Sequence, residues 1–256
     1  MPLFVQRLGQ ASLDSVQEMG RMFVFLAISL AAFVTPPFRP RNLLKQIHFI
    51  GIRSLFVITL TAIFAGMVLA LQGYYTLTRF GSEALLGPAV ALSMIRELGP
   101  VLSGLMVTGR AGSALTAELG IMRIREQLDA LESMGIQPIR FLVAPRIEAG
   151  LIALPLLTVI FDVIGILGGY LVAVQLLGMS GGTYFGGIES AVVMKDIVVG
   201  LIKAFCFGLI ITWVCTYKGY YTKRGAEGVS QATTSAVVLS SVLILVCDYF
   251  ITSIML

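Results

Sequence analysis

The sequence predicts an all-α integral membrane protein that forms a single domain over residues 1–256. Of these residues 57% are hydrophobic and only 12% are charged, whereas about 25% of the residues of a soluble domain are charged. Several uncharged stretches are long enough to cross the hydrocarbon core of a bilayer, which is about 30 Å thick. The basic residues gather in the loops of one predicted face. These three observations exclude an ordinary soluble domain and a disordered chain.

Residues 1–35 are expected to form an N-terminal interfacial helix followed by a membrane-dipping, re-entrant segment. The first twenty residues place their apolar side chains on one helical face, as in a helix that lies on a membrane. The next apolar run, 22–34, would reach only about 20 Å as a helix, against about 30 Å of hydrocarbon. Pro36 and Pro37 should end this run because proline lacks a backbone N–H. The sequence leaves open whether 22–34 crosses the membrane or dips into it.

Five further apolar segments are predicted to be transmembrane helices. Residues 54–78 carry no charge and would measure about 37 Å as a helix, enough for one tilted crossing. The second segment is predicted as one long helix with Pro100 as a candidate kink. Glycines between 178 and 187 predict a loop after the third segment. The five segments are 49–78, 84–117, 149–177, 197–217 and 232–255.

The distribution of basic residues predicts the orientation of these segments. If the N-terminus is cytoplasmic, most of the 18 lysine and arginine residues lie at or near the cytoplasmic face, as the positive-inside rule requires. Five crossings then place the C-terminus on the far side. The exceptions are Arg79 and Lys195 on the outer side and Arg96 and Lys203 within the segments. The net charge of +4 thus marks one membrane face and does not indicate a nucleic-acid-binding groove.

The polar segment between the second and third transmembrane segments predicts an amphipathic helix at residues 120–135. Apolar residues recur there at helical spacing. Arg125 and Asp129 are spaced for an i,i+4 pair, and Gly135 is suited to the position after the helix end. The segment is either an ordinary interfacial loop helix or a coupling helix that docks on a cytoplasmic motor. Because the chain has no GxxxxGK[ST] phosphate loop, another polypeptide would have to hydrolyse ATP.

The residues that most often build metal or nucleophile sites are scarce. The chain has one histidine, His48, and three cysteines, Cys206, Cys215 and Cys247. Their spacing fits neither a metal site nor a disulfide framework. We therefore expect no metal, no catalytic residues and no cofactor in this chain.

Four stretches of the sequence resemble the MlaE (YrbE) family of ABC transporter permeases. The most specific covers residues 96–146 and reads RELGPVLSGLMVTGRAGSALTAELGIMRIREQLDALESMGIQPIRFLVAPR. The others are GMVLALQGY at 66–74, LPLLTVIFDVIGILGGYLV at 154–172 and GVSQATTSAVV at 228–238. The resemblance therefore extends over nearly the whole chain.

This resemblance implies a permease subunit of an ATP-driven phospholipid transporter between the inner and outer membranes, which maintains outer-membrane lipid asymmetry. It also implies location in the bacterial inner membrane, with the C-terminus periplasmic. The implied partners are an MlaF-like ATPase that binds ATP, an MlaB-like STAS-domain protein, a hexameric MlaD-like Mce-domain protein and a second copy of this chain. A coupling helix is implied at Glu126, Gln127, Leu128, Asp129, Ala130 and Leu131.

Charged residues inside the apolar segments are the other candidate site, because a charge there costs about 2.5–3.5 kcal/mol unless it faces a partner or a wet cavity. Arg96 and Lys203 lie at matching depths, which predicts a pair between Glu97 and Lys203 with Arg96 free to meet a lipid phosphate. The alternative is a salt bridge that only holds two helices together. With apolar residues that resemble the lining of the family's lipid cavity, the predicted lipid-binding set is Leu69, Leu77, Phe80, Arg96, Glu97, Leu98 and Lys203.

A second class of function is an ion-coupled secondary transporter of a lipid or amphiphile. Arg96, Glu97, Asp162 and Lys203 would then form a proton or ion relay. Against it stand the lack of a convincing inverted repeat and an odd number of predicted spans. An intramembrane enzyme or a scaffold without transport activity are further alternatives.

Overall fold

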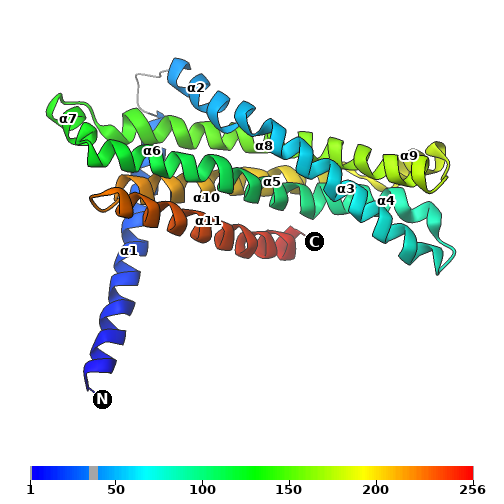
Figure 1. The fold of residues 1–256 in the computed structure, drawn as a ribbon, viewed down its shortest axis with the longest axis horizontal. Helices are drawn as coiled ribbons and strands as arrows, with labels where there is room; N and C mark the ends of the chain where they lie inside the picture. The colour runs from blue at the N-terminus through cyan, green and yellow to red at the C-terminus, as the bar shows by residue number, and fades with distance from the viewer. Residues whose placement is uncertain (1, 35–39, 256) are drawn as a thin grey trace.

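The computed structural model describes residues 2–34 and 40–255, and throughout these ranges its regular secondary structure is helical (Figure 1). This confirms an all-α integral membrane protein. The predicted helix end at Pro36 and Pro37 lies outside the described residues. The α-helices are α1 (Pro2–Val34), α2 (Pro40–Ile50), α3 (Leu55–Thr78), α4 (Leu86–Ser93), α5 (Gly99–Val107), α6 (Ser113–Ile124), α7 (Gln127–Ser133), α8 (Ala144–Tyr170), α9 (Gly181–Ala191), α10 (Met194–Tyr220) and α11 (Ala226–Met255).

Shorter helical segments join several of these helices without breaking them. Two 3₁₀ segments, η1 (Ile52–Ser54) and η2 (Glu83–Leu85), precede α3 and α4. Four π-helical segments are η3 (Met94–Leu98), η4 (Thr108–Gly112), η5 (Ile139–Val143) and η6 (Leu171–Leu176). The second predicted segment is therefore one helical run over 83–124. Because η3 ends directly before α5, Pro100 is accommodated at the first turn of α5.

Six helical runs of the described residues are long and apolar enough to cross a membrane. Five of them contain nearly all residues of the predicted transmembrane segments and extend beyond one or both ends of each, because a helix continues into the interfacial region where charged side chains are tolerated. The sixth, Val16–Phe33, belongs to α1. Figure 1 shows α3, α8, α10 and α11 along the long axis of the bundle, whereas α1 crosses it steeply and its N-terminal half projects away. This direction favours an α1 that lies near the membrane plane.

The helix predicted over residues 120–135 is wrong as a single element. Helix α6 ends at Ile124, and α7 begins at Gln127 after a turn in which Glu126 adopts a left-handed conformation with φ of 56°. The turn also changes the predicted ion pair, since Arg123 Nη1, and not Arg125, lies 2.7 Å from Asp129 Oδ1. An i,i+4 pair requires a continuous helix, which the turn interrupts.

The predicted end of this region at Gly135 is confirmed. Gly135 has φ of 74°, which a residue with a Cβ rarely adopts. Its N–H donates to Glu132 O (2.9 Å), and the Ile136 N–H donates to Leu131 O (2.9 Å). These two bonds form the Schellman motif, which satisfies the last carbonyls of a helix.

The loop predicted from glycines between 178 and 187 is also wrong. A turn at Gly178, with φ of 73°, is followed by helix α9. Tyr184 of α9 is fully buried, and its hydroxyl donates to Ile166 O (3.1 Å). Burial of this aromatic ring in the core orders a segment whose glycine content alone favours a loop.

The core is centred where α3 packs along α8. Ile58, Ala62, Gly66 and Ala70 form the buried face of α3. A Cβ at Gly66 would overlap the backbone of Gly165 on α8, and one at Gly168 would overlap the carbonyl of Ile63. Small residues thus let two helix backbones touch, as is common between membrane helices.

A methyl group at this crossing should therefore destabilise the bundle. We expect Gly66→Ala to lower the free energy of unfolding by about 1–3 kcal/mol, the usual cost of overpacking, because the backbone of Gly165 cannot turn aside as a side chain can. Thermal unfolding in detergent measures the effect. Gly109→Ala is the matched control, since nothing lies within 4 Å of a Cβ at that helical position. Equal melting temperatures for the two variants would contradict the prediction.

Candidate functional site

Six polar side chains from three helical runs meet inside the bundle, and we call them the polar cluster. Two come from the π-helical segment η3, two from α10 and two from α11. They are Arg96, Glu97, Asp196, Lys203, Asp248 and Thr252. The cluster therefore links the helical run 83–124 to α10 and α11.

Lys203 is the centre of the polar cluster. Its side chain is fully buried, and its ammonium group has three hydrogen atoms to donate. Nζ lies 2.6 Å from Glu97 Oε2, 2.8 Å from Arg96 O and 2.9 Å from Asp248 Oδ1. The structure therefore contains the predicted pair between Glu97 and Lys203, and it adds a hydrogen bond to the Arg96 carbonyl and an ion pair with Asp248.

The backbone explains why one of these partners is a carbonyl. In an α-helix the Arg96 carbonyl would accept a hydrogen bond from the N–H of the residue four positions later, which is Pro100 and has none. Just before Pro100 the chain forms a π-helical turn, in which the Gly99 N–H donates to Met94 O, five residues earlier. Pro100 cannot donate to the Arg96 carbonyl, and this carbonyl accepts a hydrogen bond from Lys203 Nζ.

The expectation that Arg96 is free for a lipid phosphate is wrong in this structure. Its Nε donates to Asp196 Oδ1 (2.8 Å), and its Nη2 lies 2.6 Å from the same oxygen. Asp196 is buried and also accepts from Val193 N (3.0 Å) at the start of α10. A buried carboxylate needs a charged partner, and Arg96 is that partner.

A cavity of about 30 Å³ lies beside the polar cluster. Its lining includes Arg96, Glu97, Asp196 and Thr252 but none of the apolar residues predicted to bind lipid. Leu69, Leu77 and Leu98 are half-buried and pack against the core, whereas Phe80 is 77% exposed. This cavity of a single chain is too small for a phospholipid, so the lipid-binding role of these residues stays a prediction.

Sequence reasoning missed three members of the polar cluster. They are Asp196, Asp248 and Thr252. The spacing of these residues could have identified them. Asp196 and Lys203 are seven residues apart, and Asp248 and Thr252 are four apart, so each pair lies on one face of its helix. Polar faces on two helices at one depth indicate a shared contact.

The second candidate site is α7, which contains most of the residues predicted to couple to an ATPase. Leu128 is fully buried in a cluster that includes Phe25, Val214, Tyr217 and Tyr220. Leu131 is half-buried, and the side chains of Glu126, Gln127, Asp129 and Ala130 are exposed. Helix α7 therefore presents a mostly polar surface outward, while Leu128 belongs to a buried cluster that α7 shares with α1 and α10.

The comparisons with known proteins agree over almost the entire chain. The profile of the family described as Permease MlaE matches residues 43–254. The chain is 43% identical over 255 residues to the intermembrane phospholipid transport system permease protein MlaE of Haemophilus influenzae, covering 98% of this chain and 97% of that one. It is 44% identical to a probable ABC transporter permease protein of Rickettsia bellii, over 96% of this chain and 95% of that one.

A more distant relative comes from a plant. The chain is 39% identical over 213 residues to the chloroplastic protein TRIGALACTOSYLDIACYLGLYCEROL 1 of Arabidopsis thaliana, covering 83% of this chain and 61% of the plant protein. The bacterial relatives are named as permeases, the non-enzymatic membrane subunits of ABC transporters, in which ATP hydrolysis belongs to a separate subunit. On the family match and these identities, the chain belongs to the MlaE permease family.

Proposed function

We propose that this chain is the permease subunit of an ATP-driven phospholipid transporter between the inner and outer membranes, which maintains outer-membrane lipid asymmetry. The observation that carries the proposal is the 43% identity, over nearly the full length of both chains, to a protein named as an intermembrane phospholipid transport permease. The absence of a phosphate loop from the sequence supports ATP binding by a partner, with no cofactor held by this chain.

The proposed complex contains two copies of this chain, an MlaF-like ATPase, an MlaB-like STAS-domain protein and a hexameric MlaD-like Mce-domain protein. The exposed polar surface of α7 supports docking of the ATPase there, because it stands at the end of the bundle (Figure 1). A cavity of lipid size would form between the two copies, since the cavity beside the polar cluster of one chain holds only about 30 Å³.

The proposed location is the bacterial inner membrane, with the N-terminus cytoplasmic and the C-terminus periplasmic. Basic residues support this orientation. Arg123 and Arg125 flank the end of α6, and Lys218, Lys223 and Arg224 flank the turn between α10 and α11. Figure 1 shows α7 and this turn at one end of the bundle and α9 at the other. The positive-inside rule assigns the α7 end to the cytoplasm.

In the proposed mechanism, closure of the ATPase subunits moves α7, and Leu128 transmits that motion to α1 and α10. Since α10 carries Lys203, the motion would change the polar cluster and the tilt of α10 and of the helical run 83–124. Apolar side chains of the first run would bind acyl chains, and Arg96 or Lys203 would attract a phosphate only after giving up Asp196 or Glu97. Head-group binding is thereby coupled to opening of the cluster.

Reconstitution of the purified complex in proteoliposomes tests the proposal. We expect transfer of labelled phospholipid between donor vesicles and the Mce-domain protein that requires ATP and is lost without the ATPase. An ionophore that collapses the proton gradient should have no effect. Transfer that continues without ATP but stops with the ionophore would overturn the proposal and favour the ion-coupled relay. That relay is not supported by Asp162, which lies against Gly99 and forms no hydrogen bond with the described members of the polar cluster.

A further inference from the structure

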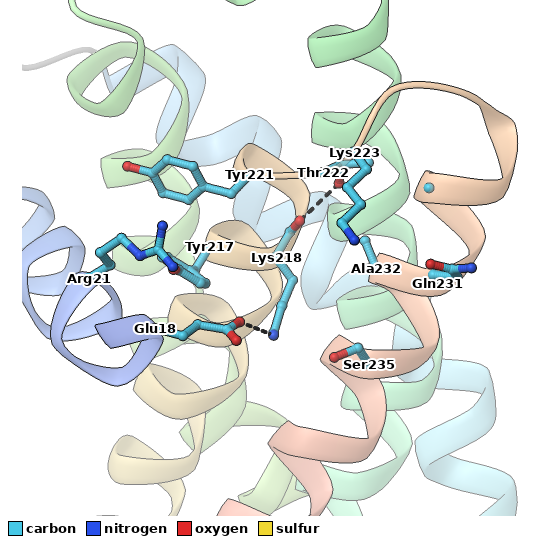
Figure 2. A pocket seen from close by; sticks show the side chains of 11 residues that line it. Glu18, Arg21, Tyr217, Lys218, Tyr221, Thr222, Lys223, Gln231, Ala232 and Ser235 are labelled. Atoms are coloured by element: carbon cyan, nitrogen blue, oxygen red, sulfur yellow. Dashed lines mark hydrogen bonds and ion pairs between the residues drawn. The ribbon is translucent and has the colours of Figure 1, made fainter. Parts of the chain in front are cut away.

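A pocket of about 440 Å³ lies where α1 meets the end of α10 and the start of α11. Figure 2 shows Glu18 and Arg21 of α1 on one side and side chains of α10 and α11 on the other. We call it the α1 pocket, and its lining includes Glu18, Arg21, Lys218, Tyr221, Lys223 and Gln231. It shares no residue with the polar cluster or with α7, so it goes beyond the proposed transport mechanism.

The walls of the α1 pocket are fixed by contacts between α1 and α10. Lys218 Nζ lies 2.5 Å from Glu18 Oε1. Trp213 Nε1 donates to Met22 O (2.9 Å), and the Trp213 ring packs against Phe23 with ring centroids 5.4 Å apart. The pocket therefore exists before any ligand binds, which lowers the entropy cost of binding.

The charge of the α1 pocket favours an anion. Three basic side chains and one carboxylate line it, for a formal net charge of +2. The carboxylate of Glu18 is paired with Lys218, whereas Arg21 and Lys223 form no ion pair with any of the side chains that the structure describes, which are those of residues 13, 16–33 and 40–255. These two cations, beside the hydroxyl of Tyr221 and the amide of Gln231, offer the donors that a phosphate group accepts.

An apolar groove of about 380 Å³ continues from the α1 pocket between α1 and α11. The two share Glu18, Lys218 and Ser235. The remaining lining of the groove is Met19, Met22, Val238, Leu239 and Val242. From Gln231 to Val242 helix α11 advances about 16 Å, so its surface changes from polar to apolar with distance from its first turn, as a bilayer changes from head group to acyl chain.

We propose that the α1 pocket and this groove bind one anionic phospholipid of the membrane leaflet at the α7 end, with its phosphate beside Arg21 and Lys223 and an acyl chain along Val238 and Val242. A free phosphate or nucleotide would leave the groove empty, and a neutral hydrocarbon would leave two cations without a counter-charge. An amphiphile with an anionic head group satisfies both parts. The lipid would hold α1 against α10 and α11, whether or not the protein transports lipid.

Native mass spectrometry of the purified full-length chain in detergent tests this inference. Phosphatidylglycerol is titrated against the wild type and against Arg21→Gln/Lys223→Gln. We expect the double variant to bind about 25-fold more weakly, which corresponds to about 1 kcal/mol for each basic side chain near an anionic lipid. Lys45→Gln removes an exposed lysine from α2 at the same end of the bundle and should bind as the wild type does. Equal affinity of the double variant and wild type would overturn the proposal.

A second variant separates a lipid from a free phosphate. Val242→Trp fills the groove and leaves the charges of the α1 pocket unchanged, so it should weaken binding of phosphatidylglycerol at least fivefold. Glycerol 3-phosphate should not displace the lipid at equal concentration. Displacement by glycerol 3-phosphate together with normal lipid binding by Val242→Trp would assign the pocket to a soluble phosphate. Because binding is measured without the ATPase, failure of phospholipid transport would not affect this result.

Discussion

Replacement of Lys203 by alanine should cost about 3–5 kcal/mol of folding free energy, the usual result when one partner of a buried ion pair is removed. Lys203 is fully buried and lies within 2.9 Å of Glu97, Asp248 and the carbonyl of Arg96. Without it, the carboxylates of Glu97 and Asp248 lose their shared cation, and the Arg96 carbonyl loses a hydrogen bond that Pro100 cannot replace. Thermal unfolding in detergent should show a melting temperature several degrees lower.

A compensated variant distinguishes this explanation from simple loss of packing. Lys203→Met combined with Glu97→Gln and Asp248→Asn removes the charges together, so it should recover most of the stability lost in Lys203→Ala. Arg79→Gln removes one positive charge from an exposed position just after α3 and should leave the melting temperature unchanged. If the triple variant is as unstable as Lys203→Ala, the charge balance of the polar cluster is not what stabilises the bundle.

Replacement of Leu128 by aspartate should detach α7 from the bundle and cost at least about 4 kcal/mol. Loss of a buried leucine side chain alone costs about 2–5 kcal/mol, and an unpaired carboxylate adds to that cost. Leu128 is fully buried in a cluster that also contains residues of α1, η5, α8 and α10. In the reconstituted complex, stimulation of the ATPase by lipid should therefore be lost even if the subunits still assemble.

The matched control for this variant is Met134→Asp. Met134 directly follows α7 and is 65% exposed, so the same new charge should change the stability by less than about 0.5 kcal/mol. Leu128→Ala should give an intermediate loss without a buried charge. Normal lipid-stimulated ATPase activity of the assembled Leu128→Asp complex would contradict transmission through this leucine.

The sequence determined the helical class and the approximate extent of the long helices. Uncharged runs of this length have few alternatives, because only a helix or a closed barrel satisfies backbone hydrogen bonds in lipid. It also predicted the pair between Glu97 and Lys203, since two charges at one depth in apolar segments must each find a partner. The suitability of glycine for the position after a helix end located that end at Gly135, where φ is positive.

The rest of the polar cluster depended on tertiary structure. Depth along a helix can be counted from the sequence, but the direction in which a side chain points depends on how the helices rotate and bend. The π-helical turn η3 changes the register of Arg96 and Glu97 relative to the α-helical residues before them, and the packing of α10 then brings Asp196 to Arg96. The hydrophobic pattern does not specify how the helices are rotated about their axes, so the contact between Arg96 and Asp196 could not be predicted from it.

Tertiary structure also decided the turn at Glu126, the burial of Tyr184 in α9 and the direction of α1. A left-handed glutamate and a glycine-rich helix both oppose local propensity, and packing of Leu128 and Tyr184 outweighs it. For α1, the same apolar run fits a helix that spans the membrane or one that lies along it. The sequence thus determined which segments are helical and apolar. The direction of α1 was decided by its contacts with α10, through Glu18 and Met22, because composition carries no information about the angle between two helices.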